Sequence, residues 1–437
     1  MNDILTRRQL ILDRMETNSL AIFFAAPEAI RSNDTNYPYR QNSDFWYLTE
    51  FAEPEAAFIL IKEDNNKPAQ TILFNRKKDP LAETWTGYRL GQQAALAQLH
   101  VDKAYLFDEI EQILPALLTN RSALYHANQQ YQYADKIIEQ TLHTLRNGQS
   151  QNYHAPTSLI DWRPLLHEMR LFKSANELNI MRQAGKITAQ GHLRAMKNCQ
   201  VGMYEYQLEA EILHEFAING ARSPSYNTIV GGGNNGCILH YENNSDTLKN
   251  GDLVLIDAGC EYQYYAGDIT RTFPINGKFS PAQREIYDIV LQAQNRAIEL
   301  LKPGTSIKEV NNHVIRIMVE GLIKLGIMQG DIATLIEEQA YRQFYMHGLG
   351  HWLGIDVHDV GNYQNASRER KLEPGMVLTV EPGLYINKDA NVPEKYRGIG
   401  IRIEDNIVIT ETGNEILTAD VPKDPELIEL VMAKHHD

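Results

Sequence analysis

The chain has 437 residues, of which 43% are hydrophobic and 22% are charged, and its formal net charge is −14. This length exceeds that of a usual single domain, so we expect two globular domains. The basic residues form no long cluster, which excludes the electrostatic footprint of a nucleic-acid-binding protein, and nucleic acid is not an expected partner.

The sequence predicts a cytoplasmic protein. Residues 1–8 contain no apolar stretch of signal-peptide length, and no apolar run approaches the roughly 18 residues that a membrane span needs. Cys199, Cys237 and Cys260 are too few and too scattered for a disulfide framework or a thiolate zinc site, which fits a reducing compartment. We therefore expect no membrane partner, and packing roles for the cysteines.

The first part of the chain alternates short apolar runs, which predict strands, with helix-like stretches. The expected strands are 21–24, 57–61 and 71–74, and the expected helices lie near 5–15, 108–119 and 130–147. The chain turns polar at 147–152, and Pro156 and Pro164 follow, as in an interdomain connection. These features predict an α/β domain over residues 1–173.

The second part of the chain, residues 174–437, shows one order of elements twice. Ser174 and Glu177 form a capping-box pattern, and Ser280-Pro281 and Ser306 mark two later helix starts. The expected elements are helices 174–199 and 204–219 with strands 226–230, 253–258 and 264–274, then helices from 280 and 306 with strands 376–380 and 399–410. Two helices followed by paired strands, twice, predict an α+β domain with an internal duplication.

Four carboxylates and one imidazole in this domain are placed to meet at one point. They are Asp257, Asp268, His351, Glu381 and Glu404. Asp257 and Glu381 end apolar strands beside turns, and a hairpin would bring Asp268 next to Asp257, because paired strands lie about 4.8 Å apart. Alternation over 399–405 sends Arg402 and Glu404 to one face, which taken alone is also typical of an exposed face. Four clustered carboxylates repel one another, so we predict that two divalent cations neutralise them.

Histidines add proton-transfer groups to this set. His347 and His351 have the spacing of a zinc-protease helix, but Gly348, Gly350 and Gly354 disfavour a helix and no Glu follows His347. We expect a loop or irregular strand that holds one ligand and the proton-handling imidazoles, with His358 next in line. His240 follows an apolar run, where a core histidine is the alternative.

These residues resemble the ligand signature of the pita-bread metallopeptidases (M24 type), and most closely their aminopeptidase P branch. The similarity runs nearly end to end, through residues 37–48, 160–164 and 224–230. It implies the pita-bread fold with pseudo-twofold symmetry for residues 174–437, and hydrolysis of the bond between an N-terminal residue and a following proline. The alternatives are a prolidase acting on Xaa-Pro dipeptides and a non-catalytic peptide-binding protein. The intact ligand set argues against the latter.

The resemblance also implies roles at the metal centre. Asp268 and Glu404 would bridge two ions, Asp257 would complete one, and His351 with Glu381 the other. The ions expected are Mn(II), with Co or Zn as alternatives. A water shared by two cations loses a proton near neutral pH and becomes the hydroxide nucleophile.

Proton transfer and oxyanion stabilisation are expected from neighbouring side chains. Glu381 would shuttle the proton of the nucleophile, and His240 would protonate the leaving proline nitrogen. His358 and His347 would stabilise the oxyanion. Arg402 would orient a metal ligand or hold a substrate carbonyl, with a purely structural salt bridge as the alternative.

Substrate contacts are predicted around the same centre. The free amino terminus would bind near Asp257, while His347, Tyr226 and Tyr385 would shape a pocket for the proline ring. The relatives assemble as tetramers, so a homo-oligomer (dimer or tetramer) is expected, in which Trp85 acts across subunits. Residues 149–151 lack the basic residue expected of the closest relatives, and we assign them no substrate contact.

Overall fold

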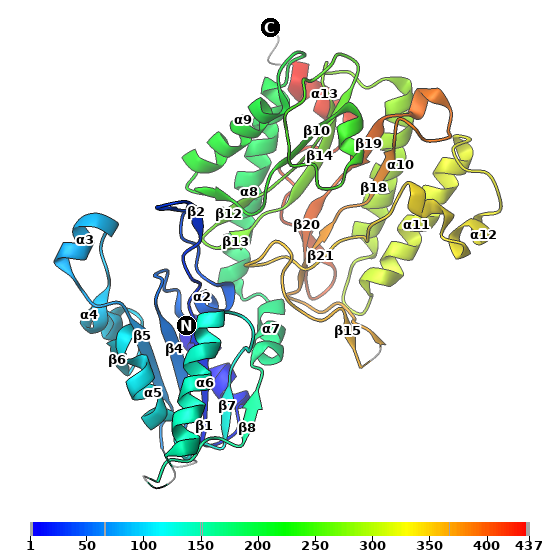
Figure 1. Cartoon of the computed structure of the whole chain (residues 1–437). Helices are drawn as coiled ribbons and strands as arrows, with labels where there is room; N and C mark the ends of the chain where they lie inside the picture. The colour runs from blue at the N-terminus through cyan, green and yellow to red at the C-terminus, as the bar shows by residue number, and fades with distance from the viewer. Residues whose placement is uncertain (1–2, 65–66, 149, 151, 367, 434–437) are drawn as a thin grey trace. The chain divides into compact units, whose positions relative to one another are not determined.

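The computed structural model describes residues 3–64, 67–148, 150, 152–366 and 368–433 (Figure 1). The chain forms two compact units, Met1–Met169 and Arg170–Asp437. The division falls close to the predicted boundary at residues 173 and 174, and Arg170 and Lys173 pair with Asp359 of the second unit at 2.6 and 3.0 Å. None of the helices within the described ranges is long and apolar enough to cross a membrane. Gln149 and Gln151 lie outside the described residues.

The first unit is built on a six-stranded sheet in the order β6-β5-β4-β1-β7-β8. The central strand β1 is antiparallel to β4 and parallel to β7, and all of its residues are buried. The predicted strands correspond to β1, β4 and β5, and the predicted helices to α1, α5 and α6. The strands are β1 (Ser19–Phe24), β2 (Ile30–Ser32), β3 (Thr35–Asn36), β4 (Ala57–Lys62), β5 (Gln70–Asn75), β6 (Lys103–Leu106), β7 (Ala123–Tyr125) and β8 (Ser158–Ile160).

The helices of this part of the chain include the three that the sequence predicted. They are α1 (Asp3–Arg14), α2 (Ser43–Thr49), α3 (Pro80–Thr86), α4 (Gly91–Gln98), α5 (Ile110–Leu118), α6 (Gln132–Asn147) and, leading into the second unit, α7 (Arg163–Leu171). A core of aliphatic side chains lies between the sheet and α5 and α6. Leu20, Ile22, Leu114 and Leu145 belong to it.

The second unit confirms the predicted duplication. Helices α8 (Ala175–Asn198) and α9 (Glu205–Ile218) lie on one side of the strands, and α10 (Pro281–Leu300) and α11 (Ile307–Lys324) on the other (Figure 1). The predicted capping box starts α8, where Glu177 N donates to Ser174 Oγ at 3.2 Å and Ser174 N donates to Glu177 Oε2 at 2.8 Å. The shorter helices α12 (Ile332–Glu337) and α13 (Pro425–Ala433) complete the unit.

Each half of the second unit contributes a three-stranded sheet and a hairpin; in the first half β9 adds a third strand to the hairpin, and the second half has the additional pair β15–β16. The first half has β9 (Ser223–Pro224), β10 (Ile229–Gly232), β11 (Leu253–Ala258), β12 (Cys260–Tyr262), β13 (Tyr265–Ala266) and β14 (Ile269–Pro274). The second half has β17 (Val377–Val380), β18 (Gly383–Ile386), β19 (Ile399–Arg402), β20 (Asp405–Ile409) and β21 (Asn414–Ile416), preceded by β15 (Gln364–Asn365) and β16 (Arg368–Glu369). The sheets are β10-β11-β14 and β17-β20-β21, and the hairpins are β12–β13 and β18–β19.

The repeat places the predicted metal ligands at equivalent points of the two halves. Strand β11 corresponds to β17, and β14 corresponds to β20, with one hairpin between each pair. Asp257 on β11 therefore matches Glu381 directly after β17, and Asp268 before β14 matches Glu404 before β20. This symmetry explains how residues so far apart in the chain converge.

Two of the predicted strands are interrupted, and the interruptions carry ligands. The predicted strand 264–274 divides into β13 and β14 around Asp268, and 399–410 divides into β19 and β20 around Glu404. At both breaks a backbone N–H donates a hydrogen bond to a residue of the other half of the repeat. Asp268 N donates to Asn406 Oδ1, and Glu404 N donates to Thr270 O, both at 3.0 Å. The prediction of strict alternation over residues 399–405 is therefore wrong. Ile403 and Glu404 were expected on opposite faces of one strand, but both are buried beside the break. The predicted strand at 226–230 also begins later, at Ile229.

Candidate metal centre and active site

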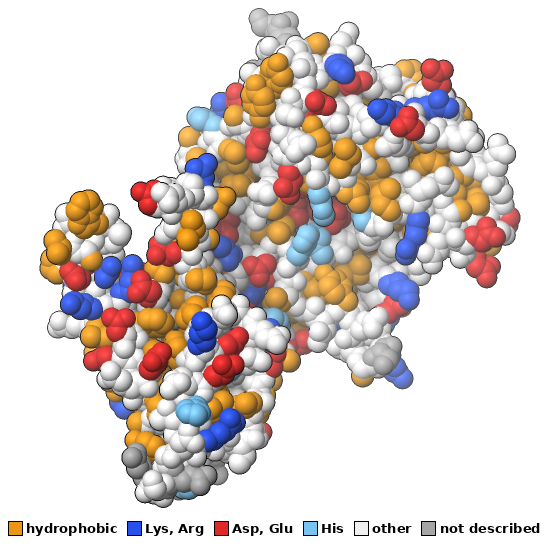
Figure 2. Space-filling model, in the orientation of Figure 1, with side chains coloured by type: hydrophobic (Ala, Val, Ile, Leu, Met, Phe, Trp, Pro, Cys, Tyr) orange, Lys and Arg blue, Asp and Glu red, His pale blue; other side chains and the backbone are white. Residues whose placement is uncertain are grey.

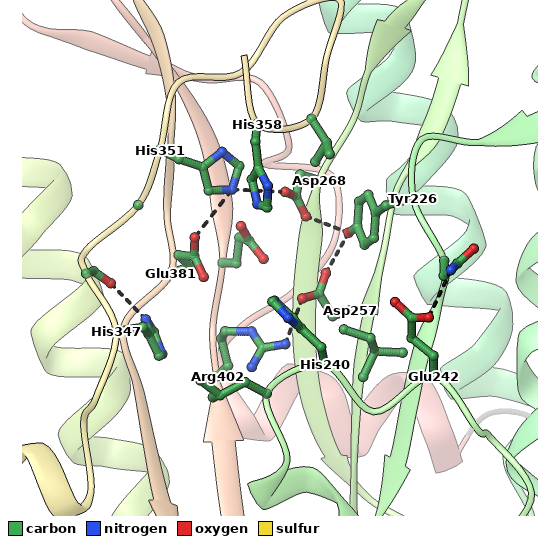
Figure 3. A pocket seen from close by; sticks show the side chains of 17 residues that line it. Tyr226, His240, Glu242, Asp257, Asp268, His347, His351, His358, Glu381 and Arg402 are labelled. Carbon is green, nitrogen blue, oxygen red and sulfur yellow. Dashed lines mark hydrogen bonds and ion pairs between the residues drawn. The ribbon is translucent and has the colours of Figure 1, made fainter. Parts of the chain in front are cut away.

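A cavity of about 490 Å³ opens in the second unit, where the strands of the two halves meet (Figure 3). Its wall includes all five predicted metal ligands and most of the predicted catalytic and substrate-binding side chains. They are Asp257, Asp268, His351, Glu381, Glu404, Tyr226, His240, His347, His358 and Arg402. The two halves of the repeat thus share one site.

The ligand atoms of Asp268, His351 and Glu404 lie within 4.8 Å of one another, close enough to hold one metal ion. His351 Nε2 is 3.5 Å from Asp268 Oδ2 and 3.5 Å from Glu381 Oε1, so Glu381 adjoins the same group. Carboxylate oxygens with a single imidazole suit divalent cations that prefer oxygen ligands. The donor chemistry therefore fits the predicted group.

Asp257 joins this group through Tyr226 and Arg402. The Tyr226 hydroxyl lies 2.5 Å from Asp257 Oδ1 and 2.5 Å from Asp268 Oδ1, and Arg402 Nη2 donates to Asp257 Oδ2 at 2.7 Å. This ion pair is compatible both with the predicted role of Arg402 in orienting a metal ligand and with the alternative of a purely structural salt bridge. The sequence predicted that Tyr226 shapes the pocket for the proline ring, whereas in the structure its hydroxyl contacts two predicted metal ligands. Nothing in the local sequence indicates these hydrogen bonds.

Burial and mutual repulsion make these carboxyl groups hard to ionise together. Burial, followed by the charges of neighbouring carboxylates, raises the pKa of Asp268 and of Glu404, and burial raises the pKa of Glu381 to about 7. Burial also acts against ionisation of Asp257, but Arg402 and the Tyr226 hydroxyl outweigh it and lower the pKa of that carboxyl. Two divalent cations would balance the charges that the site otherwise neutralises with protons.

Two threonines hold the ligands in equivalent ways in the two halves. Thr270 Oγ1 donates to Glu404 Oε2 at 2.6 Å and accepts from Arg402 Nε at 3.0 Å. Thr379 Oγ1 donates to Glu381 Oε1 at 3.2 Å and accepts from His351 N at 3.0 Å. Sequence reasoning missed both threonines. Their position two residues from an acidic ligand was the available signal, because side chains two apart share a strand face.

Hydrogen bonds define the protonation of His347. Its Nδ1 lies 2.8 Å from the Gly348 carbonyl, which can only accept, so Nδ1 carries the hydrogen and Nε2 accepts from the Tyr385 hydroxyl at 2.7 Å. Burial lowers the pKa of His347 to about 4, which keeps the ring neutral. Both nitrogens are therefore engaged and none offers an N–H to an oxyanion. We keep only the predicted role of His347 in the proline pocket.

Tyr385 requires a correction. It is 2% exposed, and its hydroxyl accepts from Arg402 Nη1 at 2.9 Å while donating to His347. The residue lies behind the cavity wall, so it positions Arg402 and His347 instead of touching the proline ring. The sequence could not distinguish these roles, because both place a tyrosine near the site.

The other histidines lie as the loop prediction requires. Residues 345–351 form no helix. The rings of His351 and His358 meet edge to face with centroids 4.4 Å apart. His240 is exposed on the cavity wall, which excludes the alternative of a core histidine. The proton-transfer and oxyanion roles of His240 and His358 remain predictions, as does the role of Trp85, which lies on α3 of the first unit and is 84% exposed.

A duplicated α+β unit with a carboxylate-rich cavity at its pseudo-twofold centre defines a metal-dependent hydrolase. Comparison with family models matches residues 179–411 to "Metallopeptidase family M24" and residues 4–125 to "Aminopeptidase P, N-terminal domain". The chain belongs to the M24 metallopeptidase family and carries the N-terminal domain of aminopeptidase P.

Individual relatives resemble the chain over nearly its whole length. It is 61% identical to the Xaa-Pro aminopeptidase of Escherichia coli over 98% of this chain and 96% of that protein, and 55% identical to that of Haemophilus influenzae with the same coverage. Proline aminopeptidase P II from Yersinia pestis has a TM-score of 0.97 at 62% identity, covering 99% of both chains. Zinc-substituted E. coli aminopeptidase P in complex with product has a TM-score of 0.98 at 60% identity, covering 100% of this chain and 98% of that one.

Proposed function

We propose that this enzyme releases the N-terminal residue from peptides that have proline in second position. The observation that carries the proposal is the convergence of all five predicted ligands on one cavity, in a chain 61% identical to an Xaa-Pro aminopeptidase. Family members with a degenerated ligand set would lack this arrangement.

Two divalent cations, when bound, supply an activated water and a Lewis acid at the scissile carbonyl. Asp257, Asp268, His351, Glu381 and Glu404 would hold them. Glu381, whose Oε1 accepts from Thr379 Oγ1 at 3.2 Å, is the carboxylate we assign to accept the proton of that water and pass it on. The proline nitrogen must gain a proton before it leaves, and His240 on the opposite wall is the donor we assign. His358 would donate to the oxyanion.

We further propose that the ions are Mn(II), that the enzyme is a homo-oligomer and that it is located in the cytoplasm. Oxygen atoms dominate the donor set, which favours Mn(II) over the softer alternatives Co and Zn. The exposed Trp85 supports a homo-oligomer in which α3 meets a second subunit. Cys199, Cys237 and Cys260 are free thiols, which supports a cytoplasmic location.

The test is hydrolysis of an Xaa-Pro-Xaa tripeptide beside the matching Xaa-Pro dipeptide, after chelation and stepwise restoration with Mn(II). We expect cleavage of the tripeptide, dependent on the metal. Cleavage confined to the dipeptide would establish a prolidase instead. The absence of bound divalent ions together with the absence of Mn(II)-dependent hydrolysis would favour a non-catalytic peptide-binding protein.

Variants connect this activity to the site. Glu381→Ala and Asp268→Asn should each abolish turnover while the thermal unfolding transition persists. Asp389→Asn, at an exposed acid outside the cavity, is the control. Full activity in either cavity variant would contradict the proposed centre.

A further inference from the structure

The cavity has chemically different sides (Figure 3). His347 lies on one side, and Glu242 lies on the opposite side, beyond Asp257 and Tyr226. Asp257 lies between them: its Oδ2 accepts from Arg402 Nη2 at 2.7 Å, and its Oδ1 lies 2.5 Å from the Tyr226 hydroxyl. With the free amino terminus of a peptide placed near Asp257, as predicted, the neighbouring Glu242 side of the cavity is open to the side chain of the first residue.

Glu242 is an acidic side chain of the cavity wall that the mechanism above does not use. It is exposed, and Asn227 Nδ2 donates to its Oε2 at 2.9 Å, which orients the carboxylate. No cationic side chain of the described ranges forms an ion pair with it. The charge of Glu242 is thus available to a ligand.

The cavity wall that carries Glu242 also presents two aliphatic side chains. Ile229 and Leu239 line the same cavity and belong to one hydrophobic cluster with Leu255. Lys and Arg combine a long aliphatic stem with a charged head, and they bury the stem along apolar surface while the head stays in a polar setting. The combination of two aliphatic side chains and a carboxylate matches this type of side chain.

We propose that Glu242, Ile229 and Leu239 form a subsite that selects a basic first residue, Arg or Lys, in Xaa-Pro peptides. The stem would pack on Ile229 and Leu239, and the guanidinium or ammonium group would pair with the Glu242 carboxylate. The inference rests on the proposed function and specifies its substrate. Asn227 is a positioning residue, because it acts by orienting Glu242.

The experiment compares kcat/KM for Arg-Pro-Xaa with that for citrulline-Pro-Xaa, in which a neutral ureido group replaces the guanidinium at nearly the same shape. We expect wild-type enzyme to prefer Arg by about threefold to fivefold, as one partly exposed ion pair would produce. Glu242→Gln should reduce this ratio to about one without changing kcat/KM for the citrulline peptide or the metal content. Glu242→Lys should favour Glu-Pro-Xaa over Arg-Pro-Xaa.

Glu411→Gln is the control, because it removes the same charge from an exposed position outside the cavity. Glu411→Gln should retain the wild-type ratio of kcat/KM between the Arg and citrulline peptides. If the ratio fell in Glu411→Gln as it does in Glu242→Gln, the preference would depend on the net charge of the protein, and the proposed subsite would be wrong. An Arg-to-citrulline ratio of one in wild type, or an unchanged ratio in Glu242→Gln, would also overturn it. Failure to cleave either peptide, with metal bound, would instead contradict the proposed function itself.

Discussion

The Tyr241 hydroxyl donates a hydrogen bond of 2.8 Å to Glu205, a fully buried carboxylate at the first position of α9. The carboxylate also accepts three further hydrogen bonds, from Gly232 N at 2.8 Å, Asn235 Nδ2 at 3.0 Å and Asp246 N at 2.8 Å. These donors come from both ends of the segment that presents His240 to the cavity. We therefore expect Glu205 to position His240, although Glu205 lies outside the cavity wall.

Glu205→Gln should lower kcat by about tenfold to a hundredfold, because an amide cannot accept all four hydrogen bonds and a small displacement of a catalytic group is costly. Metal content should not change, since no predicted ligand lies in this segment. The decisive measurement is a double-mutant cycle with His240→Ala. In the His240→Ala background, Glu205→Gln should cost less than about twofold.

The control for this cycle is Glu177→Gln, which alters a buried carboxylate at the start of another helix, α8. It should destabilise the fold without coupling to His240. Additive effects of Glu205→Gln and His240→Ala would contradict the positioning role.

Thr270→Val should weaken metal binding by about tenfold to a hundredfold, because it removes the hydroxyl that orients Glu404. Titration of the chelated protein with Mn(II) measures this directly. Thr228→Val is a matched control, since the buried Thr228 hydroxyl has no hydrogen-bond partner within the described chain. Equal metal affinities in the two variants would rule out a special role for Thr270.

Metal binding should release protons near neutral pH. Burial raises the pKa of Glu381 to about 7. Burial would lower the pKa of His351, but the hydrogen bond with Asp268 and the charge of that carboxylate outweigh burial and raise the pKa to about 9. Both groups therefore carry protons that a cation must displace. Affinity should therefore increase as pH rises from about 6 to 8. Calorimetry at pH 7 in buffers of different ionisation enthalpy should give different heats of binding, whereas identical heats would contradict the prediction.

Asp359 should stabilise the second unit in a pH-dependent manner. Its carboxylate accepts from Arg170 Nη2 at 2.6 Å and from Lys173 Nζ at 3.0 Å, and these cations outweigh burial to lower its pKa. The folded-state pKa lies below the unfolded value of about 3.9, so the stabilisation is complete above that pH and is lost as pH falls through the folded pKa.

Asp359→Asn should cost about 3 to 5 kcal/mol at pH 7, because it removes the buried carboxylate that Lys173 and Arg170 share, although Arg170 keeps its pair with Asp356. It should also make stability less dependent on pH in the acid range. Chemical unfolding from pH 3 to pH 7 measures both effects. Asp161→Asn breaks the exposed pair with Arg163 and should cost less than about 1 kcal/mol. A loss at Asp359 as small as this would show that the buried pairs contribute little.

Local patterns account for much of what the sequence predicted. Capping residues located the starts of α8, α10 and α11, and apolar runs ending in acids located Asp257 and Glu381. The same patterns failed where tertiary contacts override local geometry. At Glu404, hydrogen bonds from the other half interrupt the strand that alternation had predicted.

The main helices and strands of the second unit and its duplication were predicted from the sequence alone, because period, capping and turn chemistry act over a few residues, and the same patterns proposed the five candidate ligands. Only the tertiary structure decided how the site is held. Tyr226 lies 31 residues from Asp257, Glu205 lies 36 from Tyr241, and Thr270 lies 134 from Glu404. Hydrogen bonds between such distant residues depend on how elements far apart in the chain pack against one another, and no local pattern encodes that packing.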